Sequence, residues 1–463
     1  MTFGDKGSGV ADYDLVVIGG GAGGMGAART AIRRRARVAL VQDGPIGGDC
    51  TFVGCVPSKT LIESAAQGDD FVTAMGRVTK AVGDIAATET AAVLRKEGIV
   101  VIEGAARLLS SRRVSVNDVE LRARKLVIAT GTSPLIPPIP GLTELDVLTN
   151  ETVFDLGERP ASLLVIGGGS IGVELAQAFA RLGTAVTIVE AADRLLSREE
   201  PDASAIVAAT LGADGVKVIT GREIVGARGG PGGARLALDD GSEVHGSRVL
   251  VAVGRAPVTA DLDLAVAGVA LDQRGFIVTD DHLRSSVGNI WAAGDIAGKV
   301  QLTHAADEMG RIAANNALSK VAYRRFRAHQ VPAVTFTDPE VAHVGVTEAA
   351  AADIQGARVA FLPMSEVDRA IAAGRTEGFV KLLVGPRRVT RNLAGGRLLG
   401  ATVVAPRAGE MIHEPALIMR SDMFPARLAL TVHAYPTWSL AIRQAASQLF
   451  VETGGRRARA PRS

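Results

Sequence analysis

The hydrophobic pattern of the chain contains the same arrangement twice: an apolar run, a glycine-rich turn and an alanine-rich segment. The turns are residues 19–24, Gly-Gly-Gly-Ala-Gly-Gly, and residues 167–172, Gly-Gly-Gly-Ser-Ile-Gly. Continuous apolar runs of this kind are typical of strands buried on both faces of a sheet. Such strands are predicted at 13–18, 38–41, 163–166 and 185–189. The pattern therefore predicts two strand–helix–strand units, with the second helix ending near Leu182.

The rest of the chain is less regular. A helical stretch is predicted from Lys59 to about Gly98, and a mixed domain of strands and helices from about Val331. The segment Gly385 to Arg397 is expected to be a solvent loop, residues 1–11 to be flexible and residues 453–463 to be disordered. Further strands that run into glycine are predicted at 126–131, 249–255 and 289–295. The predicted fold class is α/β, with two Rossmann-like units and an α+β C-terminal domain.

Composition and charge narrow the class of protein. At 463 residues the length suggests about three domains, and 47% hydrophobic against 22% charged residues is typical of a globular chain. Lys and Arg number 51 against 49 Asp and Glu, so no overall charge favours nucleic acid as a partner. Neither a signal-peptide pattern nor an apolar stretch of about 18 residues is found, so no membrane association is expected. With only two cysteines, a cytoplasmic location is expected.

Both cysteines, Cys50 and Cys55, lie in one short segment after the first unit. Residues five apart on an α-helix have Cα atoms roughly 8.6 Å apart, beyond the roughly 7 Å that a disulfide can bridge. If the sulfurs bond, an uninterrupted helix under both is therefore excluded, and Gly54 suits a tighter backbone. Because a bridge over so short a loop removes little chain entropy, the pair indicates redox chemistry.

The two glycine turns predict two dinucleotide sites, because glycines let the backbone approach a pyrophosphate at a helix N-terminus. The motif residues are Gly19, Gly21 and Gly24 in the first unit, and Gly167, Gly169, Ile171 and Gly172 in the second. Twenty-three residues after the first glycine lie Gln42, beside Asp43, in the first unit and Glu190 in the second. A carboxylate there accepts from a 2′-hydroxyl and repels a 2′-phosphate, so Glu190 predicts NAD over NADP. Arg194 and Arg198 are close enough in sequence to weaken that preference.

Two nucleotide units and a dithiol suggest a relay, in which a nicotinamide reduces a flavin and the flavin reduces the disulfide. A cation would favour a thiolate near the flavin, and Lys59, four residues after Cys55, is the candidate. Glu174, just inside the helix after the second turn, could pair with Lys59. The alternatives are a surface lysine and a glutamate that only complements the helix dipole.

These motifs together resemble the class I pyridine nucleotide-disulfide oxidoreductases, the family of dihydrolipoamide dehydrogenase, glutathione reductase and mercuric reductase. The resemblance covers about residues 12 to 450 and includes, besides the motifs above, segments 129–134, 253–257, 293–295, 336–342 and 434–437. It implies a homodimer that binds FAD at the first unit and NAD at the second. The expected domains are an FAD-binding domain at 12–152 and 277–330, an NAD(P)-binding domain at 153–276 and a dimerisation domain at 331–452.

The resemblance also implies roles for single residues. Cys50 would be the exposed interchange thiol, and Cys55 the thiol that faces the flavin. Gly254 would join the second turn at the NAD site, and the dimerisation domain of one subunit would complete the active site of the other. Besides the first turn, the implied FAD contacts are Gln42, Asp43, Lys59, Gly104, Ala105, Thr130, Gly131, Asp295, His304 and Ala305.

One departure from the family bears on the substrate. The disulfide reductases of the family carry a His directly before Pro-Thr and a Glu five residues beyond that His, where this chain has Tyr435 and Leu440. A phenol with a pKa near 10 is a poor base at neutral pH, and a general base is worth roughly 10²–10⁴ in rate. We therefore expect poor turnover of lipoamide and glutathione disulfide. His433 could replace the base if the segment is extended, since residues two apart then share a face; otherwise it is a packed or surface histidine.

The tyrosine is similar to that of mercuric reductase, but that family also uses a cysteine pair near its C-terminus, and both cysteines here are already assigned. No metal site is predicted, because the other histidines show no ligand pattern. The favoured interpretation is an FAD enzyme that oxidises NADH through Cys50 and Cys55, with Lys59, Glu174 and Tyr435 in the active site. Its acceptor would be a quinone, an oxidant or a soft metal ion. The alternatives are a dihydrolipoamide dehydrogenase with His433 as base, and a flavin–dithiol redox sensor.

Overall fold

The computed structural model describes residues 12–462 except 118, 231 and 322. The predicted flexible segment 1–11 lies outside the described residues. The chain divides into two compact units. The first comprises 1–57, 76–135 and 254–328, and the second comprises 58–75, 136–253 and 329–463. The three-domain division expected from the sequence is finer than this one and stays a prediction.

The first unit is built on a seven-stranded sheet with the strand order β3-β2-β1-β6-β5-β4 and β16 beside β6. β1 pairs in parallel with β2 and with β6, and β16 joins β6 in parallel. The strands predicted at 13–18 and 38–41 are β1 and β2, and their apolar residues are buried. The bounds are β1 (Tyr13–Ile18), β2 (Val38–Gln42), β3 (Val100–Glu103), β4 (Ala106–Ser110), β5 (Arg113–Val116), β6 (Val119–Ile128) and β16 (Ile290–Ala292).

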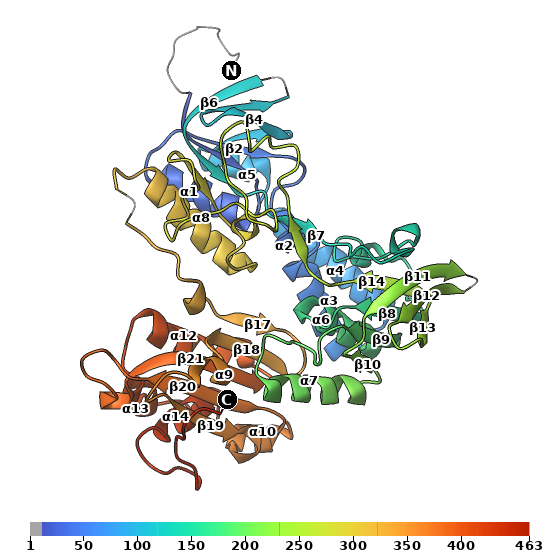
Figure 1. Ribbon diagram of the computed structural model, residues 1–463, viewed down its shortest axis with the longest axis vertical. Helices are drawn as coiled ribbons and strands as arrows, with labels where there is room; N and C mark the ends of the chain where they lie inside the picture. The colour runs from blue at the N-terminus through green and yellow to red at the C-terminus, as the bar shows by residue number, and fades with distance from the viewer. Residues whose placement is uncertain (1–11, 118, 231, 322, 463) are drawn as a thin grey trace. The chain divides into compact units, whose positions relative to one another are not determined.

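Two helices of this unit, α1 (Ala22–Arg33) and α8 (Thr303–Ala317), lie side by side (Figure 1). Glycines allow the close approach, because a Cβ on Gly310 would lie 2.0 Å from the carbonyl oxygen of Gly23. Gly24 serves the turn before α1 in the same way, since its Cβ would lie 1.8 Å from the carbonyl oxygen of Gly19. The third glycine of the motif thus packs the helix against its own turn.

The helical stretch predicted at 59–98 consists of three helices. They are α3 (Cys55–Ala66), α4 (Phe71–Ala86) and α5 (Ala91–Lys96). Thr90 caps α5, because its side chain accepts a hydrogen bond from the N–H of Val93.

The part of the second unit that carries the second glycine turn is a four-stranded parallel sheet with the order β10-β9-β8-β14. A three-stranded antiparallel sheet, β11-β12-β13, follows β10 in the chain. The predicted strands at 163–166 and 185–189 are β8 and β9, and the helix predicted to end near Leu182 is α6. The bounds are η1 (Leu142–Glu144), η2 (Val153–Asp155), β8 (Ser162–Ile166), α6 (Ser170–Arg181), β9 (Ala185–Glu190), α7 (Pro201–Ala213), β10 (Lys217–Thr220), β11 (Ile224–Gly230), β12 (Gly233–Leu238), β13 (Glu243–Gly246) and β14 (Arg248–Val251).

The C-terminal part of the second unit is a five-stranded antiparallel sheet with the order β17-β18-β21-β20-β19. Its apolar core joins the sheet to α11, α12 and α14. The loop expected at 385–397 lies between β20 and β21 and contains the short turn η6. The bounds are β17 (Ala333–Thr335), β18 (Glu340–Gly345), α9 (Glu348–Ala351), β19 (Arg358–Pro363), η5 (Met364–Glu366), α10 (Asp368–Ala373), β20 (Phe379–Gly385), η6 (Leu393–Gly395), β21 (Arg397–Ala405), α11 (Ala408–Met411), α12 (His413–Arg420), α13 (Ala426–Leu430) and α14 (Leu440–Ser447).

Residues 453–462 differ from the disordered tail that the sequence predicts. Arg459 and Val359 exchange backbone hydrogen bonds of 2.7 and 2.9 Å. The guanidinium of Arg459 also pairs with the Glu348 carboxylate. The hydrophobic pattern missed this segment because backbone hydrogen bonds and an ion pair hold it in place. Neither kind of contact produces a periodic pattern of apolar residues in the sequence.

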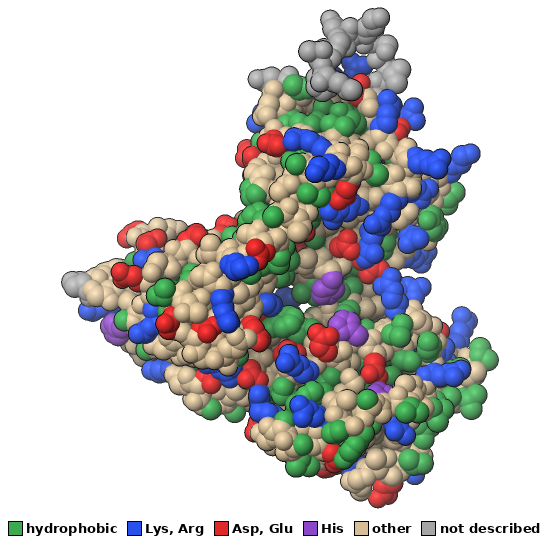
Figure 2. Space-filling view, turned by 180° about the vertical axis from the view of Figure 1, so that it is seen from behind, with side chains coloured by type: hydrophobic (Ala, Val, Ile, Leu, Met, Phe, Trp, Pro, Cys, Tyr) green, Lys and Arg blue, Asp and Glu red, His purple; other side chains and the backbone are tan. Residues whose placement is uncertain are grey.

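The surface carries both signs of charge. Figure 2 shows basic and acidic side chains interspersed over one face, in keeping with 51 Lys and Arg against 49 Asp and Glu. Within the described part of the chain, no helix combines the length and the apolarity needed to cross a membrane.

Candidate active site

The cysteine segment is a helix that breaks and starts again. α2 (Gly48–Phe52) carries Cys50, and α3 begins at Cys55. The break confirms that no continuous helix runs under both thiols. Gly54 is needed there for space, because a Cβ on it would lie 2.8 Å from the carbonyl oxygen of Asp49.

The two cysteines are free thiols that hydrogen-bond to each other. That bond, with burial, raises the pKa of the Cys50 thiol well above its ordinary range. The hydroxyl of Thr303, the first residue of α8, lies 3.2 Å from Cys55 Sγ. Cys55 is exposed and Cys50 half-buried, the reverse of the expected order. Exposure in the single chain thus gives no support to the two thiol roles, which stay predictions.

The predicted FAD residues follow the carboxyl ends of parallel strands in the first sheet. Gly19 follows β1, Gln42 ends β2, Gly104 follows β3, Thr130 and Gly131 follow β6, and Asp295 follows β16. Ligands of open α/β sheets bind outside this edge. The sheet therefore brings together residues that lie up to 276 positions apart in the sequence.

The first glycine turn has the features that a dinucleotide requires. Gly19 has φ +106° and Gly131 φ +72°, values that favour glycine. Gly21 is the N-cap residue of α1, and among the described residues no side chain caps the helix and no acidic residue lies in its first turn. Its N–H groups therefore suit an anionic pyrophosphate. Gln42 closes the turn, because its Oε1 accepts the N–H of Gly20.

Other predicted FAD residues are anchored near this turn. The buried carboxylate of Asp295 accepts a hydrogen bond of 3.0 Å from Thr132 Oγ1, and burial raises its pKa. The N–H of Gly104 donates to the Gln42 carbonyl at 2.8 Å, and Thr130 Oγ1 donates to the Val258 carbonyl.

Three of the predicted FAD residues differ in exposure. His304 and Ala105 lie on the surface, whereas Ala305 has no exposed area. Side-chain exposure does not decide whether the backbone of this segment contacts the cofactor, so the role of Ala305 stays a prediction. α8 turns this residue into the core, because the helix packs against α1.

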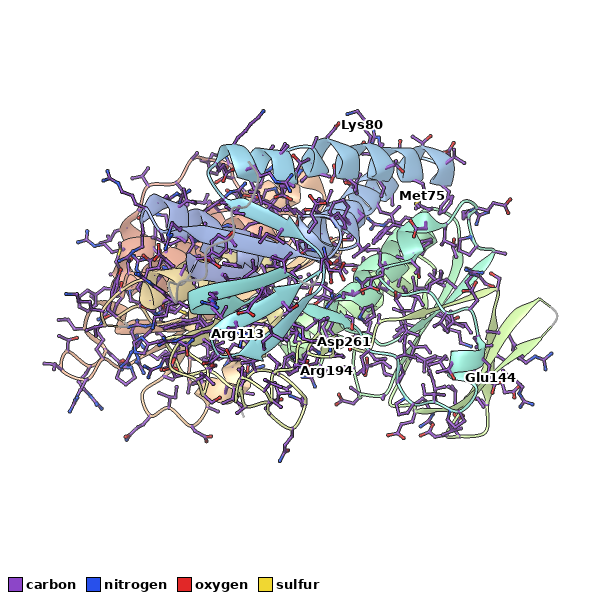
Figure 3. All side chains as sticks on the ribbon, turned by 90° about the horizontal axis from the view of Figure 1, so that it is seen from above. Met75, Lys80, Arg113, Glu144, Arg194 and Asp261 are labelled. Atoms are coloured by element: carbon purple, nitrogen blue, oxygen red, sulfur yellow. The ribbon has the colours of Figure 1, made fainter. Side chains whose placement is uncertain are left out.

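The second glycine turn repeats the hydrogen bond of the first, with the charged Glu190 in the place of Gln42. Glu190 Oε2 accepts the N–H of Gly168 at 2.5 Å, and its Oε1 accepts the N–H of Ala192 at 2.7 Å. Among the described residues no side chain caps α6, and its first turn has no acidic residue. Arg194, labelled in Figure 3, donates through Nη2 to the Ser197 carbonyl of its own loop at 2.7 Å. Ile171, the fifth residue of the turn, is exposed. Gly254, three residues after the end of β14 in sequence, is exposed as well.

The ion pair predicted between Lys59 and Glu174 forms. Lys59 Nζ lies 2.8 Å from Glu174 Oε2 and 4.7 Å from the centroid of the Phe336 ring. The other oxygen of the buried Glu174 accepts the N–H of Phe336 at 2.8 Å. Glu174 therefore does more than complement the dipole of α6, and it fixes the lysine one helical turn after Cys55.

Tyr435 is held as a hydrogen-bond donor. Its side chain is highly exposed, with 70% of its area accessible. A hydrogen bond to the carboxylate of Asp368, the first residue of α10, raises the pKa of the phenol. The phenol therefore keeps its proton at neutral pH even more firmly than an isolated tyrosine, and less phenolate is available to act as a base.

His433 is packed rather than presented to a substrate. Only 5% of its side chain is exposed. Its Nε2 lies 2.9 Å from Glu414 Oε2, and its Nδ1 lies 3.0 Å from the Thr431 carbonyl oxygen. Both nitrogens are therefore engaged within the chain and are not presented to a substrate. This contact argues against His433 as the replacement base.

Sequence reasoning missed several partners of the predicted residues. They are Thr303, Asp368, Glu414 and the role of Arg255, which pairs with Asp49. For Arg255 a signal existed, because it lies in segment 253–257, one of the segments on which the family resemblance depends. The other three come from elements distant in sequence and had no such signal.

The comparisons with known proteins cover almost all of the chain. Residues 13–310 match the pyridine nucleotide-disulphide oxidoreductase family, and residues 331–446 match the dimerisation domain of that family. A mercuric reductase of Staphylococcus aureus is 33% identical over 456 residues, covering 94% of this chain and 82% of the relative. A dihydrolipoyl dehydrogenase of Thermus scotoductus is 34% identical over 460 residues, covering 94% and 97%.

A solved structure agrees with these relatives. The Cu(II) complex of RclA, an HOCl-induced flavoprotein disulfide reductase from Escherichia coli, superposes with a TM-score of 0.86 at 30% sequence identity. The match covers 95% of this chain and 99% of that one. The chain therefore belongs to the class I pyridine nucleotide-disulfide oxidoreductases, FAD-dependent enzymes that use NAD(P)H.

Proposed function

We propose that this enzyme oxidises NADH and delivers the electrons, through Cys50 and Cys55, to an acceptor that is not a standard disulfide. The observation that carries the proposal is the pair of Tyr435 and Asp368 at the position where the disulfide reductases of the family have a histidine base. A phenol hydrogen-bonded to a carboxylate donates a proton in a hydrogen bond but does not remove one from a dithiol at neutral pH.

The first glycine turn and Asp295 would hold FAD, which when bound supplies two-electron transfer between NADH and the cysteine pair. Lys59, fixed by Glu174 and Phe336, supplies a positive charge on the helix that begins with Cys55. The Thr303 hydroxyl can donate to a Cys55 thiolate over the 3.2 Å that separates them. Both groups favour charge on Cys55, while Cys50 keeps its proton.

NADH is the expected reductant. Glu190 presents a carboxylate at the end of β9, where the ribose of a nicotinamide nucleotide would lie. Arg194, which could have bound a 2′-phosphate, is engaged with Ser197 of its own loop. With Arg194 engaged, the negative charge of Glu190 favours a 2′-hydroxyl.

The acceptor class follows from the tyrosine that stands in place of the family's histidine base. Reduction of a quinone, an oxidant or a soft metal ion depends less on a histidine base than dithiol–disulfide exchange with lipoamide does. Relatives include mercuric reductases and the HOCl-induced RclA, whose structure was solved with Cu(II). Their names support an inorganic or reactive acceptor for this chain.

A homodimer would complete the site. The dimerisation-domain match supports two copies, and Tyr435 of the partner subunit would then line the acceptor side. The role given to the tyrosine therefore depends on the dimer.

Steady-state assays with NADH and a series of acceptors test the proposal. We expect kcat/KM for lipoamide and glutathione disulfide to lie at least about 100-fold below that for a quinone or Cu(II), because one general base contributes about that much. Brisk lipoamide turnover would contradict the proposal.

A His433→Ala variant separates the alternative with a histidine base. We expect quinone and Cu(II) turnover to stay within about twofold of the unmodified enzyme, since both ring nitrogens are already engaged. A steep loss confined to lipoamide turnover would instead identify His433 as the base.

A further inference from the structure

The segment that carries Cys50 is anchored on both sides of the cysteine. Before it, Asp49 pairs with the guanidinium of Arg255. After it, Thr51 Oγ1 donates to Glu89 Oε2 at 2.9 Å. All of these residues belong to the first unit. The Cys50 backbone is thus tied to two other elements by the side chains of its two neighbours.

Arg255 connects this segment to the predicted cofactor residues. It is the first residue of β15 (Arg255–Pro257), which pairs with β7 (Thr132–Pro134), and 13% of its side chain is exposed. Nη2 donates to the Thr132 carbonyl and Nε to Thr132 Oγ1, each at 2.7 Å. Asp295 Oδ2 lies 4.0 Å from Nε. One planar guanidinium therefore reaches both sides of the site, as the fork of an arginine allows.

The charges of this cluster are two carboxylates and one guanidinium. Asp49 neutralises Arg255 on the side of Cys50, and Asp295 does so on the side of the cofactor. Without Asp49, more of the guanidinium charge would act on the cysteine pair, in which Cys55 carries the thiolate. A nearby cation favours a thiolate and therefore the reduced pair.

We propose that Asp49 is a positioning residue that, through Arg255, sets the reduction potential of the Cys50–Cys55 pair. The inference rests on the proposed function, because it assumes that this pair cycles. Reduction breaks the S–S bond, takes up two electrons and one proton, and leaves one thiol and one thiolate. Asp49 opposes that thiolate by engaging the cation. It thereby limits how strongly the reduced pair is stabilised relative to the disulfide.

The test is the thiol–disulfide equilibrium of the holoenzyme in buffers of reduced and oxidised dithiothreitol at pH 7. Thiols are trapped with a maleimide of high mass and counted by gel shift. We expect Asp49→Asn to move the equilibrium about tenfold towards the dithiol, the effect of a one-unit change in thiol pKa. Asp49→Glu, which restores the carboxylate, should stay within about threefold of the unmodified enzyme.

A matched control comes from the same unit. Arg113, labelled in Figure 3, pairs with Glu120 across the antiparallel strands β5 and β6. Glu120→Gln removes one carboxylate from an arginine away from the cysteines and should leave the equilibrium unchanged. Flavin absorbance per chain, measured in parallel, should be unaltered in all variants.

Three outcomes would overturn the inference. Asp49→Asn could behave as Glu120→Gln does, its shift could occur only with loss of flavin, or the unmodified enzyme could form no reversible disulfide. The first two leave the proposed function intact, because they concern the variant alone. The third contradicts the proposed function as well.

Discussion

Glu190 differs from Gln42, its counterpart in the first unit, by one charge. Both side chains accept the N–H of the second glycine of their turn, Gly168 and Gly20 respectively. The two sites therefore share a geometry and differ in the electrostatics offered to a ribose. At the scale of the residue, the expected nucleotide preference therefore depends on one oxygen of Glu190 that is an amide nitrogen in Gln42.

Glu190→Gln should weaken the preference for NADH over NADPH. Removing the carboxylate removes the repulsion of a 2′-phosphate and one charge-assisted hydrogen bond, worth about 1.5–3 kcal/mol. We expect the ratio of the two kcat/KM values to fall about tenfold or more in steady-state assays. Glu158→Gln, at an exposed position of the same unit, is the control and should leave the ratio unchanged. An unaltered ratio in Glu190→Gln would refute the assignment.

Glu340 should make stability depend on pH. Burial raises its pKa to about 7, although its Oε2 accepts the N–H of Gly409 at 2.7 Å. Between pH 4.5 and 7 the folded chain holds a proton that the unfolded chain has released, so this group lowers stability as the pH rises through that window. Glu340→Gln should therefore raise the unfolding free energy by about 1–2 kcal/mol more at pH 8 than at pH 5.

Urea unfolding at the two pH values measures this difference. Glu452→Gln, at an exposed position of the same unit, is the control and should show no such pH dependence. Equal effects of Glu340→Gln at pH 5 and pH 8 would show that Glu340 is ionised in the folded chain at both values.

At the scale of the element, the C-terminal segment is joined to a buried ion cluster. Lys381 of β20 lies 2.9 Å from Glu200 Oε2 and 3.0 Å from Glu348 Oε2, with all three side chains buried. Burial opposes ionisation of Glu348, but Arg459, the N–H of Arg462 and Lys381 outweigh it and lower the pKa of Glu348 to about 2. The tail thus adds a second cation to a site where Lys381 already faces two buried carboxylates.

Arg459→Ala should destabilise the chain by about 1–3 kcal/mol, because it leaves a buried carboxylate with fewer donors. Since the Glu348 pKa is depressed, this stabilisation exists above pH 4.5 and is lost as the pH falls towards 2. Denaturant unfolding at pH 7 and pH 3 should show the effect shrinking. Arg456→Ala is the matched control, since it removes only the exposed pair with Glu366, worth at most about 1 kcal/mol. Equal losses for both variants would contradict the argument.

The elements of the fold divide into those that the sequence predicts and those it does not. β1, β2, β8 and β9 are buried apolar runs next to glycine turns, so periodicity and turn chemistry agree. The break between α2 and α3 followed from the distance limit on a disulfide. The tail could not be predicted, because its partners Val359 and Glu348 are about a hundred residues away. The hydrogen bond between Asp368 and Tyr435 could not be predicted either, because neither the hydrophobic pattern nor the spacing along the chain reveals it.

At the scale of the whole molecule, apolar side chains of the C-terminal part mark the expected contact between two subunits. Leu430 ends α13 and Val432 lies two residues later; they are 76% and 88% exposed, and Tyr435 lies close by in sequence. Exposed apolar clusters of this kind are typical of interfaces. The dimerisation-domain match covers this segment.

Val432→Glu should therefore shift the enzyme from dimer towards monomer, because a charge at the core of an apolar interface is costly to desolvate. Sedimentation velocity measures the shift. Val389→Glu, at an 86% exposed position in the loop between β20 and β21, is the control and should remain dimeric. A monomeric unmodified enzyme, or a dimer that tolerates Val432→Glu, would contradict the expectation.

Gln42 does more than close the first glycine turn. Its Nε2 donates to the Asp43 carbonyl at 2.6 Å and to the Pro45 carbonyl at 3.2 Å. A glutamate there would set an oxygen against both carbonyls and leave them without their donor. In the second site the situation is reversed, because both Glu190 oxygens accept backbone N–H groups and an amide nitrogen would face one of them with a second donor. The backbone around each side chain therefore favours a neutral group in the first turn and a charged group in the second.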